Sequence, residues 1–187
     1  VIARARYDLY SQSHVGAVFT DREFLGSYSR LTGVDSRLQV TPTASIDFAA
    51  LTTQNRGVDG LDTTGSMFDG GYRHSGRNLS YNVSAYQIDP DFDTEVGFMP
   101  RRDIRRISSN AGYRWWPESW LINWGPEFQY SRNWDFDDVL EDEEARLRLR
   151  MSFAKNLSFN GDIRREMERF GGINFDKNRY SLGGNVN

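Results

Sequence analysis

The clearest pattern in the sequence is an alternation of apolar and polar residues between positions 144 and 163. Within 145–153 every second residue is apolar, and the residues between them are three arginines and a serine. Successive side chains of a β-strand point to opposite faces, so this period of two predicts a strand with one apolar and one charged face. The alternation resumes over 157–163 after Ala154-Lys155-Asn156. We therefore predict a β-hairpin with a three-residue loop in which Asn156 adopts the left-handed conformation.

The same unit recurs along the chain, with alternating segments separated by connections. Short turns are expected near residues 12, 43, 76, 118 and 155, and longer connections at 22–32, 54–64, 89–100, 133–143 and 170–177. Tight turns at one end, longer loops at the other and strands of about ten residues are typical of outer-membrane barrels. The predicted strands are 1–10, 14–21, 33–41, 44–53, 65–74, 79–88, 102–115, 120–132, 145–153, 157–164 and 178–186.

The predicted fold is therefore all-β: an antiparallel, up-and-down transmembrane β-barrel with short periplasmic turns and long extracellular loops. Residues 1–187 are expected to be part of one barrel domain that is truncated at both ends, because the strand pattern begins at Val1 and continues to the last residues. About eleven strands is an odd count, whereas bacterial single-chain barrels have even counts. We expect the chain not to close a barrel alone and to pair with remaining strands of the same chain or with a partner subunit.

Composition narrows the function classes. The chain has 187 residues, no cysteine and a net charge of −3, which removes disulfide and thiol chemistry and argues against nucleic-acid binding. No apolar run approaches the roughly 18 residues that a membrane helix needs. The mean hydropathy of −0.66 is compatible with a membrane barrel, in which only every second residue meets lipid. Outer-membrane lipid is therefore an expected partner.

The alternation sorts the side chains into two faces. The expected lipid-facing residues are apolar and lie on the 145–163 hairpin: Leu147, Leu149, Met151, Phe159 and Ile163. Mixed charge on the other face could line a water-filled pore or form a salt-bridged plug, and the sequence leaves both open. The residues expected to line the lumen are Asp35, Arg37, Asp47, Glu127, Arg146, Arg148, Arg150, Asp162, Arg164 and Glu166.

The hairpin register predicts specific ion pairs. A three-residue loop that pairs Phe153 with Leu157 sets Arg148 opposite Asp162 and Arg146 opposite Arg164. Diagonal neighbours on one face remain within reach of long side chains. We therefore predict a ladder of Arg148–Asp162 and Arg146–Glu166 pairs, which would make this face a mixed-charge surface.

Three tryptophans surround one expected short turn: Trp115, Trp116 and Trp120. Tryptophan prefers the headgroup region because its ring is apolar and its N–H needs a polar partner. These residues are candidate interface aromatics, although the same side chains could belong to the core of a soluble β-protein.

No catalytic, cofactor-binding or metal-binding residue is predicted, and the protein is expected not to be an enzyme. His14 and His74 both lie beside short turns, without the ligands of a zinc site. The acidic residues between 135 and 144 lack the glycine and spacing of an EF-hand loop, so a solvated loop is favoured over a calcium site. Alternation splits the arginines at 101, 102, 105 and 106 between two faces.

A family resemblance rests on three segments. Tyr86–Arg106 reads YQIDPDFDTEVGFMPRRDIRR, and YDLYSQSHVGAVFTDRE and SWLINWGPEFQYSRNWD lie before and after it. These segments resemble the barrel region of the bacterial family named domain of unknown function 5916. The family's members carry a carbohydrate-binding-family-9-like domain ahead of an outer-membrane barrel. The resemblance implies an outer-membrane barrel and makes a saccharide a candidate partner, but it assigns no sugar site to this chain.

Three functions follow from these expectations. The first is a non-enzymatic barrel of the bacterial outer membrane that passes a small polar or saccharide solute. The second is a structural outer-membrane barrel that anchors or docks other domains or subunits without transport. The third is a soluble all-β glycan-binding domain. Detergent dependence separates the third from the others, and conductance separates the first from the second.

Overall fold

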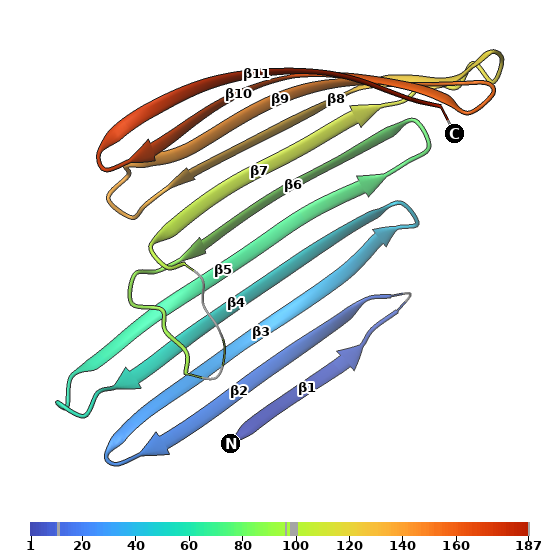
Figure 1. The fold of residues 1–187 in the computed structure, drawn as a ribbon. Helices are drawn as coiled ribbons and strands as arrows, with labels where there is room; N and C mark the ends of the chain where they lie inside the picture. The colour runs from blue at the N-terminus through green and yellow to red at the C-terminus, as the bar shows by residue number, and fades with distance from the viewer. Residues whose placement is uncertain (11, 96, 98–100, 187) are drawn as a thin grey trace. The chain divides into compact units, whose positions relative to one another are not determined.

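The computed structural model describes residues 1–10, 12–95, 97 and 101–186. Eleven strands of this part of the chain form one sheet in which each strand pairs with its neighbours in sequence (Figure 1). This confirms the all-β, antiparallel up-and-down fold. The strands are β1 (Ile2–Asp8), β2 (His14–Phe24), β3 (Ser27–Thr41), β4 (Ala44–Arg56), β5 (Asp62–Ser75), β6 (Leu79–Ile88), β7 (Ile104–Tyr113), β8 (Leu121–Trp134), β9 (Leu140–Phe153), β10 (Leu157–Phe170) and β11 (Ile173–Val186).

β1 and β11 are the two edges of the strand order. Within the described residues no ladder joins them, as expected for a chain that does not close a barrel alone. The same residues contain no helix that is long and apolar enough to cross a membrane. Ser11 of the first expected turn, and Phe98 and Pro100 of the 89–100 connection, lie outside the described residues.

The strict alternation of short and long connections is wrong at two places. β2 and β3 are joined by Leu25 and Gly26 alone, with φ of 49° and 83°, where the sequence predicted a long connection at 22–32. Gly171 and Gly172, with φ of 58° and 83°, likewise replace the predicted 170–177 loop between β10 and β11. Two other connections are shorter than expected, at 57–61 and 135–139, whereas 89–103 is long.

Charged side chains explain why the apolar pattern did not predict the end of β2 and the start of β3. The Arg30 guanidinium on β3 donates to Asp21 at 3.3 Å and to Glu23 at 2.5 Å across the ladder. Cross-strand pairs of opposite charge stabilise a sheet as apolar pairs do. The ladder therefore continues to the turn although the apolar alternation has ended.

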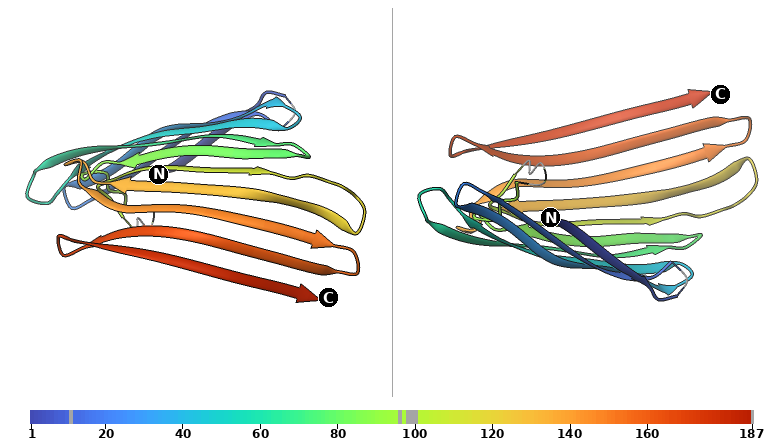
Figure 2. Two further views of the ribbon diagram at one scale, coloured as in Figure 1. Left: turned by 90° about the horizontal axis from the view of Figure 1, so that it is seen from above. Right: turned by 90° about the horizontal axis from the view of Figure 1, so that it is seen from below.

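The chain divides into two compact units, described separately below. The first unit consists of residues 1–72, 84–106 and 135–138, and the second of 73–83, 107–134 and 139–187. In the first unit β1–β4 are neighbouring strands of one layer, and in the second β8–β11 are arranged in the same way (Figures 1 and 2).

The core of the first unit lies where the 89–103 connection folds back onto the sheet. Phe92 is 0 % exposed and packs with Ile88 and Ile104 against the side chains of Leu31, Leu51, Met67 and Tyr86. The N–H of Asp93 donates to Thr53 Oγ1 at 3.3 Å, and the Asn55 amide donates to the Asp93 carbonyl at 3.0 Å. The connection is therefore fixed to one face of β4 and β5.

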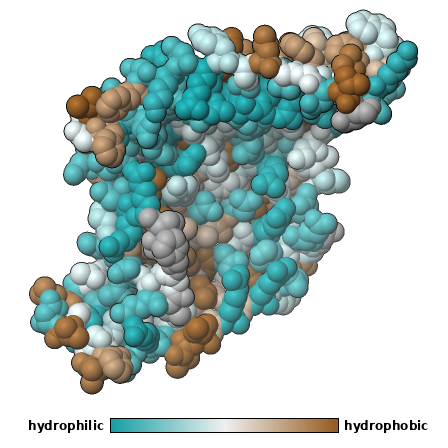
Figure 3. All heavy atoms as spheres, viewed as in Figure 1, coloured by the Kyte–Doolittle hydropathy of each residue, from teal (hydrophilic) through white to brown (hydrophobic). Residues whose placement is uncertain are grey.

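Exposure in the first unit is unusual for a soluble protein. Its buried polar residues include Ser13, Thr20, Ser29, Ser45 and Thr53, and hydrophilic residues occupy much of the face seen in Figure 3. Large apolar side chains are instead exposed on successive strands, among them Tyr7, Val15, Phe19, Val34, Ile46 and Phe48. The usual placement of apolar residues inside and polar residues outside is therefore partly reversed in this unit.

The packing of Phe92 and its connection against β5 depends on the absence of a side chain at Gly65, and this can be tested. A Cβ at Gly65 would lie 2.1 Å from the Phe92 nitrogen, so Gly65→Ala must displace the connection from β5. We expect trypsin to cleave after Arg101 and Arg102 much faster in this variant, as measured by limited proteolysis. Gly70→Ala is the matched control on the same strand, because its Cβ would meet only the Asp47 carbonyl at 3.9 Å. Equal cleavage rates in the two variants would contradict this account of the anchor.

Candidate functional site

The charged face of the second unit is built on the β9–β10 hairpin. Its register pairs Phe153 with Leu157, Arg148 with Asp162 and Arg146 with Arg164, which confirms the predicted register. Lys155 and Asn156 have φ of 65° and 59°, so the left-handed conformation predicted for Asn156 is present and Lys155 shares it. This turn brings the arginines of β9 beside the carboxylates of β10.

Asp162 is the centre of this hairpin's ion pairs. Its Oδ1 accepts hydrogen bonds from Arg146 at 2.8 Å and from the Ser181 hydroxyl at 2.8 Å, and it lies 3.9 Å from Arg148 Nε. The directly opposite pair, Arg148–Asp162, is therefore present but is longer than the diagonal pair. Long side chains reach diagonal neighbours, and here the diagonal contact is the shorter one.

The predicted Arg146–Glu166 pair is wrong. Glu166 instead pairs with Arg164 at 3.0 Å and with Arg179 at 3.0 Å. β11 is the reason, because it places Arg179 opposite Arg164 and Ser181 opposite Asp162. The hairpin alone could not reveal these partners, although the alternation of β11 places both on the same face as Asp162.

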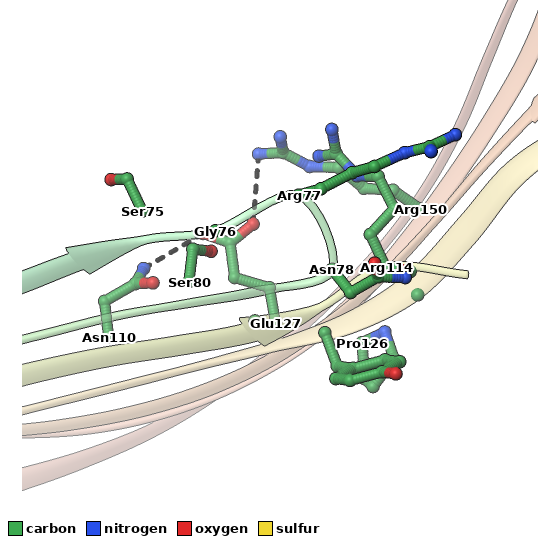
Figure 4. A pocket seen from close by; sticks show the side chains of 13 residues that line it. Ser75, Gly76, Arg77, Asn78, Ser80, Asn110, Arg114, Pro126, Glu127 and Arg150 are labelled. Carbon is green, nitrogen blue, oxygen red and sulfur yellow. Dashed lines mark hydrogen bonds and ion pairs between the residues drawn. The ribbon is translucent and has the colours of Figure 1, made fainter. Parts of the chain in front are cut away.

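Glu127 on β8 forms a second carboxylate centre in this unit. Its Oε1 accepts hydrogen bonds from the amides of Asn110 at 3.0 Å and Gln129 at 3.1 Å, and its Oε2 lies 3.4 Å from Arg150 (Figure 4). The predicted lumen residues of β8, β9 and β10 therefore form ion pairs in three groups, around Glu127, Asp162 and Glu166. That this face encloses a lumen remains a prediction.

Exposure in the middle of the hairpin separates the two faces, although Arg150 on the charged face is itself 49 % exposed. Leu147 and Ile163 are 51 % and 55 % exposed, whereas the side chains of Arg146 and Asp162 are 16 % and 8 % exposed. Leu149 and Met151 are half-buried and Phe159 is exposed. Contact of these five apolar residues with lipid remains a prediction.

The predicted lumen residues of the first unit form their own contacts. Asp35 pairs with Arg4 at 3.0 Å and lies 3.5 Å from His14 Nε2. Arg37 on β3 is opposite Asp47 on β4. Arg4 was missed as a partner, although the alternation of β1 places it on the charged face. A second missed contact joins the sheet to the 89–103 connection, where Arg22 pairs with Glu95.

The candidate interface aromatics cluster around the β7–β8 connection. Trp115 stacks on Trp124, with ring centroids 4.4 Å apart, and Trp120 stacks on Phe153 at 5.7 Å. Trp116 donates its indole N–H to the Arg77 carbonyl at 3.2 Å. A position at a membrane interface remains a prediction for all three tryptophans.

The described residues contain no group of three His, Asp or Glu side chains that could hold a metal ion. In the acidic run, Asp138 pairs with Arg105 at 2.6 Å, and Glu143 accepts a hydrogen bond from the Tyr130 hydroxyl at 2.6 Å. His74 stacks on Tyr81 with ring centroids 5.3 Å apart.

Comparisons with known proteins give one distant structural similarity and no match to a family model. No curated protein matches the chain either. Among solved structures, it is similar to OccK11 (OpdR) of Pseudomonas aeruginosa, with a TM-score of 0.46 and 15% sequence identity. The match covers 97% of this chain and 56% of the other, so the chain spans about half the length of that protein.

The geometry around Asp162 predicts unequal couplings. A double-mutant cycle with Arg146→Gln and Asp162→Asn should give a larger coupling energy than a cycle with Arg148→Gln and Asp162→Asn. Of the two arginines, Arg146 forms a hydrogen bond of 2.8 Å with this carboxylate, whereas Arg148 lies 3.9 Å from it. Thermal unfolding in detergent measures both cycles. A larger coupling for Arg148 would favour the directly opposite pair and contradict the observed geometry.

Proposed function

We propose that the chain forms part of a β-barrel in the bacterial outer membrane and passes small polar solutes, with saccharides as candidates, along its charged face. The observation that carries this proposal is the distribution of exposure, in which many large apolar side chains are exposed while Arg146 and Asp162 on the opposite face are largely covered. Apolar side chains lose no hydrogen bonds to water when lipid surrounds them, so such a face is suited to contact with lipid. The β9–β10 hairpin, with an exposed Leu147 beside a covered Arg146, is the clearest case.

The backbone supports the same proposal. A membrane-spanning sheet must pair all its N–H and C=O groups, because each unpaired group in hydrocarbon costs several kcal/mol. In the strand order from β1 to β11, each interior strand is hydrogen-bonded to a neighbour on both sides, whereas β1 and β11 each have one neighbour and form the edges. We propose that these edges pair with further strands, supplied by the same protein or by a second copy.

The charged face carries both positive and negative side chains, and this mixture supports the proposal that polar solutes pass along it. In the second unit Glu127, Asp162 and Glu166 each have two or more polar partners, so the face presents alternating charge and suits hydrated solutes. In the first unit the 89–103 connection covers part of the polar face around Thr53 and would narrow a passage there.

A structural barrel without transport is the second candidate. The observation that favours it is the saturation of the carboxylates, since Asp162 and Glu166 are both engaged by arginines. A fully ion-paired interior can act as a plug, and such a barrel would serve to anchor other domains or subunits. Current across a planar lipid bilayer decides between the two candidates.

Conductance measurements test the transport proposal. We expect the purified protein to give ion current in planar bilayers, and Asp162→Asn to shift the reversal potential under a salt gradient toward anion selectivity. The physical reason is that Arg146 and Arg148 would then face the passage with less compensation. Asp176→Asn is the matched control, because Asp176 lies opposite Met167 on the other face of the sheet.

Two results would count against this proposal. A folded, membrane-inserted protein without current would leave the structural barrel as the better account. A conducting protein with the same reversal potential for Asp162→Asn and Asp176→Asn would show that the hairpin's charged face does not line the path.

A further inference from the structure

We propose that the second unit contains a binding site for the carboxylate or phosphate group of a small anionic solute. The site is a cavity of about 360 Å³ between the β5–β6 turn, β7, β8 and β9 (Figure 4). This volume falls in the lower part of the roughly 300–1,000 Å³ range of small-molecule sites. The inference rests on the proposed function in one respect, because it takes this anion to be the solute that the charged face admits.

Two glycines form the base of the cavity. A Cβ at Gly112 would contact Ser80 Oγ at 3.5 Å and Glu127 Cβ at 3.9 Å, so this glycine lies on the charged face between two lining side chains. At Gly125 a Cβ would lie 1.8 Å from the Tyr113 carbonyl oxygen, so no larger residue fits there. Gly112 therefore leaves the space between these two side chains open, and Gly125 lets the backbone of Tyr113 approach β8 closely beside it.

The charges around the cavity are predominantly positive. Arg77, Arg114 and Arg150 line it, against the single carboxylate of Glu127. Glu127 is already engaged by Asn110, Gln129 and Arg150. This contrasts with the hairpin ladder further along β9, where arginines and carboxylates alternate.

Arg114 is the guanidinium best placed for a ligand. No ion pair engages it within the part of the chain that the structure describes, and its guanidinium carbon lies over the Trp116 ring, 5.6 Å from the centroid. Arg77 lies over the same ring at 5.6 Å and pairs with Glu118, which does not line the cavity. Two cations held at one aromatic ring produce a positive potential that a bound anion would relieve.

The recognition chemistry follows from the guanidinium group. Its planar N–H fork binds carboxylate and phosphate oxygens bidentately, and such charge-assisted bonds are stronger than neutral ones. The side chains of Arg77 and Arg150 keep exposures of 68 % and 49 %, so an anion reaches the cavity without a change in the fold. Ser80 and Asn78 also line the cavity, and the Asn78 amide donates to the Arg114 carbonyl at 2.8 Å, which leaves the Ser80 hydroxyl for the rest of a hydroxylated solute.

Ligand-observed saturation-transfer NMR on the full protein in detergent tests this site. The probes are glucuronate, glucose 6-phosphate and neutral glucose, at low ionic strength. We expect one or both charged sugars to bind at least tenfold more tightly than glucose, and added salt to weaken their binding.

Two variants test the site independently, one by removing a charge and the other by filling the cavity. Arg114→Gln removes the charge and should weaken binding of the charged sugars about tenfold or more. Gly112→Val keeps every charge but fills the base of the cavity, and it should also abolish binding. Arg165→Gln on β10 is the matched control, because it removes one positive charge outside the cavity lining and should leave affinity within about twofold. Circular dichroism confirms that each variant is folded.

Equal binding of glucose and the charged sugars would overturn the inference, as would the absence of binding by any probe. The same holds if folded Arg114→Gln and Gly112→Val both bind as the wild-type protein does. These failures are separate from failure of the proposed transport, because binding is measured without a membrane potential or a current. A protein that conducts without binding loses this site alone, and one that binds without conducting loses transport alone.

Discussion

The structure depends on one constraint: successive side chains of a strand lie on opposite faces of the sheet, and on β9 one face is apolar and the other charged. On β9 the apolar set Leu147, Leu149 and Met151 is separated by single residues from Arg146, Arg148 and Arg150. A register shift of one residue would exchange the two faces. The ion pairs of Asp162 and Glu166 with their neighbours hold β9, β10 and β11 in one register, since each carboxylate joins residues of adjacent strands. The contacts that compensate the charges of this face therefore also link its neighbouring strands.

Missing side chains shape the charged face as much as the charges do. Gly65 allows Phe92 and its connection to approach the first unit's sheet, and Gly112 leaves space open in the cavity of the second unit. Glycine in a strand interior weakens it, so its presence often marks a close approach of backbone or ligand. Here one unit uses glycine to hold a connection against the sheet, and the other uses it to open a cavity beside arginines.

The sequence predicted features that depend on local spacing. The period of two gave the hairpin register and the role of Asn156, because both follow from residues close in the chain. It failed at Leu25-Gly26, where Asp21, Glu23 and Arg30 continue the ladder without apolar residues. The Arg146–Glu166 pair failed because β11 supplied Arg179 as a competitor. The cavity was missed because it requires residues of the β5–β6 turn, β7, β8 and β9 to be placed together.

The central claim is that the apolar face contacts lipid and the charged face contacts water. Nitroxide labels placed singly at each residue from 145 to 153, in protein reconstituted into lipid vesicles, test it most directly. The account predicts high collision rates with oxygen at Ala145, Leu147, Leu149, Met151 and Phe153, and high rates with a water-soluble nickel reagent at the residues between them. Collision rates without this period of two would contradict the account.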